Sequence, residues 1–171
     1  MNVAARQLQR DRFGGDVLDA LGASGLDPAL LILEFTESTL MRDIDATASR
    51  LRVLKASGVQ LSIDDFGTGF SSLAYVGKLP IDMLKIDRSF LAEVGKTAKA
   101  LALIRTFVQL GRALGVEMLA EGIETEAQRE LLTRERVETG QGFLFARPLE
   151  PLAVEQLLGA APHFATEPVG A

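Results

Sequence analysis

A chain of 171 residues, with 47% hydrophobic and 24% charged residues, is long enough for one domain with a buried core, which excludes disorder as its overall state. It has no cysteine, which excludes disulfides and thiolate chemistry, and its net charge of -5 does not suit binding to duplex nucleic acid. No apolar run is long enough to cross a membrane or to form a signal peptide. We therefore expect a cytoplasmic protein.

The sequence predicts strands that alternate with helices. A helix over Gln7–Leu21 is expected first. Strand-length apolar runs follow at Leu31–Phe35, Val59–Ile63, Asp82–Ile86, Val116–Ala120 and Gly142–Phe145. Helix-period stretches lie at Asp45–Ala56, Thr97–Leu114, Thr125–Thr133 and Pro151–Leu158. This alternation predicts an α/β domain over residues 1–160 with a parallel sheet, and residues 161–171 are expected to form an irregular tail.

Polar residues stand at the carboxyl end of each predicted strand. They are Glu34 and Glu37, Asp64 and Asp65, Lys85 and Asp87, Glu121 and Glu124, and finally Gln141. In parallel α/β folds the ligand site lies at this edge of the sheet, so these side chains are expected to share one mouth. Phe145 and Pro148 are expected at the same mouth.

Converging carboxylates raise one another's pKa unless a cation neutralises them, and oxygen-rich sites favour Mg²⁺ or Mn²⁺. Adjacent Asp64 and Asp65 are suited to bridging two ions. Lys85 is suited to a water nucleophile or a phosphate oxygen. Each residue taken alone has another interpretation: an acid after a strand often caps the next helix, and a lysine is often only ion-paired. Because four successive strands end in such residues, a shared ligand-binding site is favoured over four separate helix caps.

The segment DFGTGFSS contains Gly67, Thr68 and Gly69, and it predicts a loop that leads into a helix. The single histidine, His163, falls in the expected tail and is given no role.

Four segments together resemble one protein family. LEFTES, IDDFGTGFSSLAYVGKLPIDMLKIDRSF, AEGIET and QGFLFARPL are similar to the EAL family of cyclic di-GMP phosphodiesterases, over about Met1 to Leu158. The resemblance implies a (β/α)₈ barrel of TIM type that hydrolyses cyclic di-GMP to linear pGpG. It also implies two Mg²⁺ or Mn²⁺ ions as cofactors and inhibition by Ca²⁺.

The resemblance further implies roles for particular residues. Asn2, Glu34 and Asp64 would bind one ion, and Asp64 would bridge to a second ion held by Asp65 and Glu121. Lys85 would orient the attacking water, while Glu121 would serve as general base or as ligand. Residues implied near the substrate are Asp87, Arg88 and Gln141. Residues implied to support the site are Glu37, Gly67, Thr68, Gly69 and Glu124.

The chain departs from the family pattern in one main respect. No Glu-Ala-Leu motif occurs in it, and 171 residues fall short of the roughly 250 of a complete barrel. We therefore expect a barrel that lacks its first strands, and an activity that this shortfall could abolish. Expected partners are cyclic di-GMP, a second copy of the chain, and a fused or interacting GGDEF or sensory domain.

Two other functions fit parts of the sequence. A non-catalytic cyclic di-GMP receptor or protein-interaction module would keep the fold without turnover. A metal-dependent aldolase or lyase would use Lys85 as a Schiff base.

Overall fold

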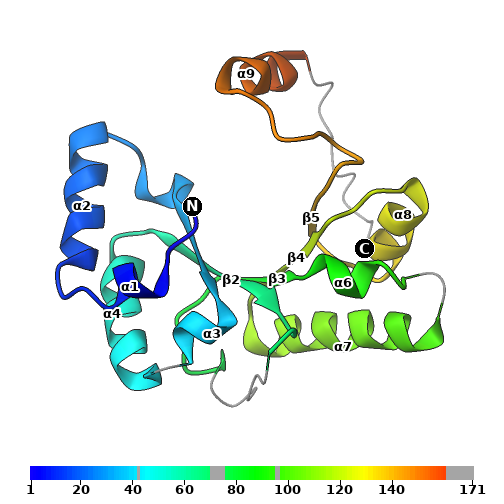
Figure 1. Cartoon of the computed structure of the whole chain (residues 1–171), viewed down its shortest axis with the longest axis horizontal. Helices are drawn as coiled ribbons and strands as arrows, with labels where there is room; N and C mark the ends of the chain where they lie inside the picture. The colour runs from blue at the N-terminus through cyan, green and yellow to red at the C-terminus, as the bar shows by residue number, and fades with distance from the viewer. Residues whose placement is uncertain (42, 70–75, 95–96, 161–171) are drawn as a thin grey trace, which may run out of the picture.

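A parallel sheet of five strands forms the centre of the molecule, in the order β1-β2-β3-β4-β5 (Figure 1). A computed structural model describes residues 1–41, 43–69, 76–94 and 97–160 of the chain. The strands are β1 (Ile32–Thr36), β2 (Gln60–Phe66), β3 (Met83–Ile86), β4 (Glu117–Glu121) and β5 (Thr139–Gln141). Every neighbouring pair is parallel, which confirms the predicted fold class.

The central strand β3 is entirely buried and the first part of β2 is largely buried, because both of their faces pack against other parts of the fold. All four residues of β3 are buried, and Leu61 and Ile63 of β2 are fully enclosed. The helix α4 packs against β2, and α7 packs against β3 and β4. This packing holds the strands in register and so fixes the positions of the side chains at their ends.

Helices follow most of the strands. They are α1 (Ala5–Leu8), α2 (Phe13–Ser24), a 3-10 turn at Pro28–Leu30, α3 (Glu37–Leu40), α4 (Ile44–Ala56), α6 (Arg88–Leu91), α7 (Ala98–Leu114), α8 (Glu126–Arg134) and α9 (Pro151–Ala160). Figure 1 shows α2 and α4 on the β1 side of the sheet and α7 and α8 on the β4 side. The helix α9 stands apart at the end of a long connection.

Local sequence signals explain where the longer helices begin and end. The side chains of Asp43, Thr97 and Thr125 each accept a hydrogen bond from a backbone N–H of the first turn. Gly115 ends α7 in the left-handed conformation, which glycine adopts without strain.

Two predicted elements are wrong. The helix expected over Gln7–Leu21 is two helices, α1 and α2, separated by a turn at residues 9–12. The run Gly142–Phe145 is a turn, and the last strand is β5, just before it. The helix expected after the DFGTG segment and the expected tail fall largely outside the described residues. Among the described helices, none has the length and apolar character that crossing a membrane requires.

Candidate active site

Lys85 lies at the centre of a group of carboxylates at the carboxyl ends of the strands. Its Nζ lies 2.6 Å from Glu121 Oε1, 3.1 Å from Asp64 Oδ1 and 3.3 Å from Glu34 Oε2. These partners come from β4, β2 and β1, so four strands meet at one ammonium group. The Lys85 side chain is only 4% exposed, and the three carboxylates are 15–22% exposed.

The surroundings of Lys85 keep its ammonium group charged. Burial alone lowers the pKa of Lys85, but hydrogen bonds and charge attraction from Glu121 and Asp64 outweigh it, so that the pKa is raised above its ordinary value. A Schiff-base lysine has to reach its neutral form, so this environment argues against the aldolase or lyase interpretation.

Asp64 and Asp65 are neighbours in sequence, yet both face the mouth. Successive residues of a regular strand point to opposite faces. Here the β2–β3 register shifts between Ile63 and Phe66, and Asp65 adopts a left-handed φ of 54°. This bulge turns Asp65 toward the side on which Asp64 already lies.

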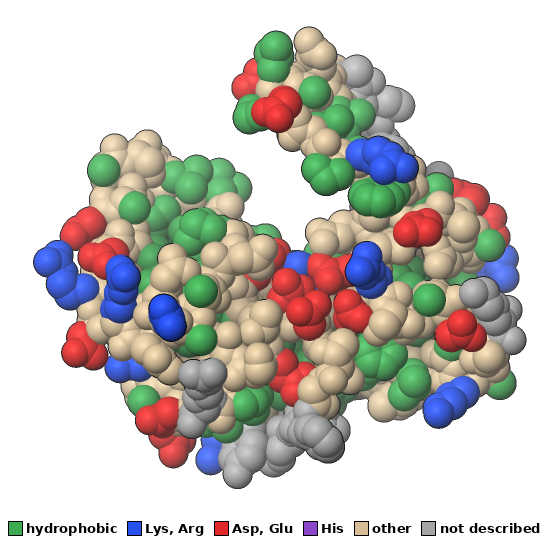
Figure 2. Space-filling model, in the orientation of Figure 1, with side chains coloured by type: hydrophobic (Ala, Val, Ile, Leu, Met, Phe, Trp, Pro, Cys, Tyr) green, Lys and Arg blue, Asp and Glu red, His purple; other side chains and the backbone are tan. Residues whose placement is uncertain are grey.

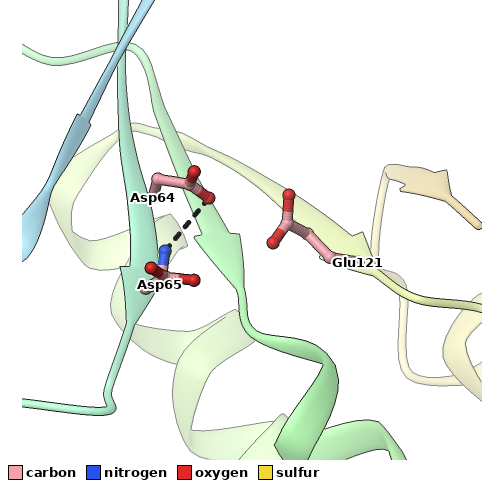
Figure 3. A group of neighbouring side chains, drawn as sticks. All are labelled: Asp64, Asp65 and Glu121. Atoms are coloured by element: carbon pink, nitrogen blue, oxygen red, sulfur yellow. Dashed lines mark hydrogen bonds between the residues drawn. The ribbon is translucent and has the colours of Figure 1, made fainter. Parts of the chain in front are cut away.

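One carboxylate oxygen each from Asp64, Asp65 and Glu121 lie within 4.8 Å of one another. Figure 3 shows the Asp64 and Glu121 side chains pointing toward one another across β3, with the Asp65 amide donating to Asp64 Oδ1 at 3.1 Å. Carboxylate oxygens are the donors that Mg²⁺ and Mn²⁺ prefer. The spacing and chemistry of this trio therefore fit a divalent cation.

Glu121 has two hydrogen-bond donors on the same oxygen. Its Oε1 accepts from Lys85 Nζ and, at 2.7 Å, from Gln141 Nε2 of β5. Burial raises the pKa of Glu121, and the opposing effect of Lys85 does not cancel it. Burial, together with the nearby charges of Asp64 and Asp87, also raises the pKa of Asp65. Both shifts indicate negative charge that a cation would stabilise.

The N-terminal residues lie beside Glu34. Asn2 forms an isolated parallel bridge with Glu34, and the Glu34 amide donates to the Met1 carbonyl at 2.8 Å. The backbone therefore places Asn2 next to a carboxylate that binds Lys85.

Glu37 supports the loop that follows Asp65. It is 5% exposed, and its Oε2 accepts from the Gly67 amide at 3.3 Å. A Cβ on Gly69 would lie 2.6 Å from Glu37 Oε1, so a larger residue there would displace the Glu37 carboxylate from this position. Thr68 Oγ1 donates to the Asp65 carbonyl at 2.8 Å and closes the turn.

Asp87 caps the helix that follows β3, which is the role that acids after a strand often have. Its Oδ1 accepts from the Ser89 amide at 3.0 Å at the start of α6, and these hydrogen bonds outweigh burial, so that the pKa of Asp87 is lowered. Asp87 also lines the mouth, together with Arg88. By contrast, Asp64 and Asp65 make no helix-capping bond among those described.

The strand ends open into a cavity of about 510 Å³. Figure 2 shows acidic side chains gathered in the middle of this face, at the foot of the hollow between α2 and α9. The lining residues are Asp65, Asp87, Arg88, Glu121, Gly122, Glu124, Gln141, Gly142, Phe143, Ala146, Arg147 and Pro148. Pro148 thus lies at the mouth, as expected.

Phe145 lines a different cavity, with Ile123 and Leu132. Phe143 and Arg147 also line the mouth, and neither was predicted from the sequence to lie there. A strand over residues 142–145, as predicted, would point these side chains in other directions. The tight turn instead brings Phe143, Arg147 and Pro148 to one side.

The fold and the site define an α/β protein with a cluster of carboxylates at the carboxyl edge of a parallel sheet, and the spacing of Asp64, Asp65 and Glu121 fits a divalent cation. The sequence model of the EAL domain family matches residues 1–148 of this chain. The chain therefore belongs to the EAL domain family.

Three proteins show how similar the relatives are. The chain is 47% identical over 160 residues to the bifunctional diguanylate cyclase/cyclic di-GMP phosphodiesterase MucR of Pseudomonas aeruginosa, with 94% of this chain covered. It is 40% identical over 169 residues to the cyclic di-GMP phosphodiesterase NbdA of the same organism, with 99% covered. The chain spans about a quarter of the length of these curated relatives, 23% of MucR and 22% of NbdA.

Solved structures of EAL proteins have the same fold. The MucR phosphodiesterase in complex with cyclic di-GMP superposes with a TM-score of 0.85 at 46% identity, over 90% of this chain and 62% of that one. A manganese and cyclic di-GMP complex of Klebsiella pneumoniae BlrP1 superposes with a TM-score of 0.80 at 30% identity, over 86% of this chain and 38% of that one. These likenesses confirm the resemblance to the EAL barrel.

Proposed function

We propose that this chain is a metal-dependent phosphodiesterase domain that hydrolyses cyclic di-GMP to linear pGpG. The observation that carries the proposal is the meeting of Glu34, Asp64 and Glu121 around the buried ammonium of Lys85, with Asp65 alongside. Membership of the EAL family and the cyclic di-GMP complex of the MucR phosphodiesterase support it.

We propose that Mg²⁺ or Mn²⁺ binds at the carboxylates. One ion would be held by Asn2, Glu34 and Asp64, and a second by Asp64, Asp65 and Glu121. When bound, the ions would lower the pKa of a water molecule and offset the charge of the phosphodiester. Ca²⁺ is larger and takes more ligands, so it is expected to support binding and inhibit turnover.

The protein side chains position the reactants. In this proposal Lys85 stays protonated, orients the attacking water through an N–H donor, and stabilises charge that develops on the departing oxygen. The carboxylate of Glu121 acts as a ligand or as general base. On the rim, Arg88 would bind a phosphate oxygen, and Asp87 and Gln141, which line the same cavity, would lie near the substrate. Glu37 and Glu124 support the loops.

The reaction consumes one water molecule. The water oxygen forms a bond to phosphorus, and the bond from phosphorus to the opposite ribose 3′ oxygen breaks. One proton of the water is transferred to that 3′ oxygen, and the new terminal phosphate of pGpG retains the attacking oxygen.

We also propose a cytoplasmic domain that works with a cyclase or sensory domain, fused or separate, and that forms a homodimer. The bifunctional relative MucR, whose name pairs the two activities, supports the first of these partners.

The test is turnover of cyclic di-GMP by the 171-residue chain in Mn²⁺ and in Mg²⁺, with pGpG identified by chromatography. We expect turnover that EDTA abolishes and that Asp64→Asn lowers at least about 100-fold, while Asp19→Asn, at a side chain 79% exposed on α2, retains it. Binding of cyclic di-GMP without any turnover in either metal would contradict the proposal and favour a receptor.

A further inference from the structure

A buried hydroxyl, that of Ser62 in β2, lies beneath the carboxylates that surround Lys85. Ser62 is fully buried, and among the described residues its Oγ is the one buried side-chain oxygen or nitrogen without a hydrogen-bond partner. Such a hydroxyl costs stability, because water hydrogen-bonds to it in the unfolded chain and nothing replaces that bond on folding. Buried polar groups are rarely left in this state in a folded protein.

The strand register places Ser62 next to Glu34. The two residues are Cα partners in the parallel pair β1–β2, whose strands lie about 4.8 Å apart, and partners of this kind point to the same face of the sheet. Asp64, two residues further along β2, points to that face as well and contacts Lys85. Ser62 therefore lies one layer below the ammonium group, on the side of the sheet that carries the site.

Glu34 is the carboxylate that Lys85 holds least closely. Lys85 Nζ lies 3.3 Å from Glu34 Oε2, against 2.6 Å from Glu121 Oε1 and 3.1 Å from Asp64 Oδ1. The Glu34 side chain is also 22% exposed, the most of the three, so its carboxylate has room to move.

A neutral donor suits Glu34 better than an ammonium does when a cation is bound. Beside the cation the contact with Lys85 would weaken, because the two positive charges repel. A hydroxyl adds no charge at that position, and its proton rotates to suit the acceptor.

We propose that the Ser62 hydroxyl positions Glu34 for a divalent cation, by donating a hydrogen bond to the Glu34 carboxylate when the cation is bound. The inference rests on the proposed function, which supplies the cation. Hydrogen bonds of this kind orient the carboxylates and imidazoles that ligate metals in proteins. The metal-free chain then bears the cost of an unsatisfied hydroxyl, and cation binding removes that cost.

Ser62→Ala separates this role from simple packing, because each predicts a different pair of results. In EDTA the variant is expected to melt roughly 2–6 °C above wild type by differential scanning fluorimetry, since alanine fills nearly the same space without the hydroxyl. Calorimetric titration with Mn²⁺ is expected to show about 10- to 100-fold weaker binding of one ion. If Ser62 only fills space, the Mn²⁺ affinity stays at the wild-type value.

Ser57→Ala is the matched control. The Ser57 hydroxyl, at the end of α4, already donates to the Leu54 carbonyl at 2.6 Å. Its removal is expected to lower the melting temperature in EDTA and to leave the Mn²⁺ affinity within about twofold of wild type.

A double variant tests whether the hydroxyl acts through Glu34. In Glu34→Ala, the trio of Asp64, Asp65 and Glu121 is left to hold one ion. Adding Ser62→Ala is expected to change the affinity for that ion by less than about twofold. A further loss as large as in the single variant would overturn the proposal, because the hydroxyl would then act on another ligand.

Two results of the main experiment would overturn the role of Ser62 alone. They are wild-type Mn²⁺ affinity in Ser62→Ala and a lower melting temperature of that variant in EDTA. A wild-type chain that binds no Mn²⁺ would instead refute the cation site of the proposed function, and the role of Ser62 with it.

Discussion

Lys85 has three carboxylate neighbours and almost no contact with solvent. Its ammonium offsets only part of their charge, and burial leaves the pKa of Glu121 raised. A divalent cation at Asp64, Asp65 and Glu121 would offset the remainder. A change in the charge of Lys85 or of one of its carboxylate neighbours should therefore change both the stability of the chain and its affinity for a cation.

Lys85→Met should remove the fixed positive charge of the site. Unfolding by urea at pH 7.5 in EDTA is expected to show a loss of about 3 kcal/mol, the lower end of the range for breaking a buried ion pair, because the carboxylates keep some exposure. Saturating Mn²⁺ should recover part of this loss, while turnover should stay about 100- to 1,000-fold below wild type.

Lys55→Met provides the control for that experiment. Lys55 pairs with Asp82, which precedes β3 at the opposite end of the strands. Its loss of stability should be independent of Mn²⁺. An equal response of the two variants to Mn²⁺ would contradict a cation site around Lys85.

Glu121 should make the metal-free chain less stable as the pH rises. Its pKa is raised in the folded state, so its contribution to stability is present below the ordinary glutamate pKa and is lost as the pH rises through the folded pKa. In EDTA, wild type should therefore lose stability relative to Glu121→Gln as the pH rises from 4 to 7. The free energy of unfolding of the variant, minus that of wild type, should increase over this range.

Glu126→Gln should show the opposite trend. A hydrogen bond from Arg129 lowers the pKa of Glu126, so its contribution is present above the ordinary glutamate pKa and is lost as the pH falls. Urea unfolding at each pH measures both differences. The same trend in both variants would show that burial does not govern Glu121.

Two irregular backbone features shape the site at the level of elements. The bulge in β2 brings Asp65 to the same side as Asp64, and the turn after β5 presents Phe143 and Arg147. Gly142 is the point at which this turn contacts the segment that follows β4. Regular strands carry the carboxylates, and these irregular segments shape the mouth around them.

Gly142→Ala should separate the turn from Ile123, because the added Cβ would lie 2.1–2.2 Å from backbone atoms. We expect a loss of stability of about 1–3 kcal/mol and weaker binding of cyclic di-GMP. Gly22→Ala, in the open interior of α2, should instead stabilise the chain by about 0.5–1 kcal/mol. Thermal unfolding of both variants is the measurement, and similar changes in the two would contradict the close approach.

The sequence predicted those elements whose burial follows from their own composition. The apolar runs of β1 to β4 each bury at least one face against the core, so the positions of these strands were predicted to within three residues. β5 was missed because its three residues, Thr139–Gln141, are exposed and carry no apolar pattern. The apolar run after it forms a turn because Gly142 contacts Ile123, a long-range approach that local sequence does not show.

The site divides in the same way. Convergence of Glu34, Asp64, Lys85 and Glu121 could be predicted, because parallel strands bring their carboxyl ends to one edge. The bulge at Asp65 depends on the pairing of β2 with β3. Phe143 rather than Phe145 lines the mouth because of the turn after β5. Neither the bulge nor this turn could be predicted from the sequence.

At the level of the whole molecule, the ligands come from segments spread over most of the chain. Glu34, Asp64 and Glu121 lie on three different strands, so the two proposed cations, which share Asp64, would together join β1, β2 and β4. A ligand that binds only the folded state stabilises it in proportion to the logarithm of its concentration. The cation should therefore stabilise the whole sheet.

Mn²⁺ at about 100 times its dissociation constant should stabilise the chain by about 2.7 kcal/mol, which corresponds to a rise in melting temperature of roughly 5–10 °C. Differential scanning fluorimetry measures the rise. Asp64→Asn should lose most of it and Asp19→Asn should keep it. An equal rise in the two variants would locate the bound cation elsewhere.

Hydrolysis of cyclic di-GMP in water enriched in ¹⁸O, with mass spectrometry of the product, tests the central claim most directly. Attack of water at phosphorus predicts pGpG with one ¹⁸O in its terminal phosphate, formed only when Mn²⁺ or Mg²⁺ is present. Unlabelled pGpG, or no product from a chain that binds cyclic di-GMP and the metal, would contradict it.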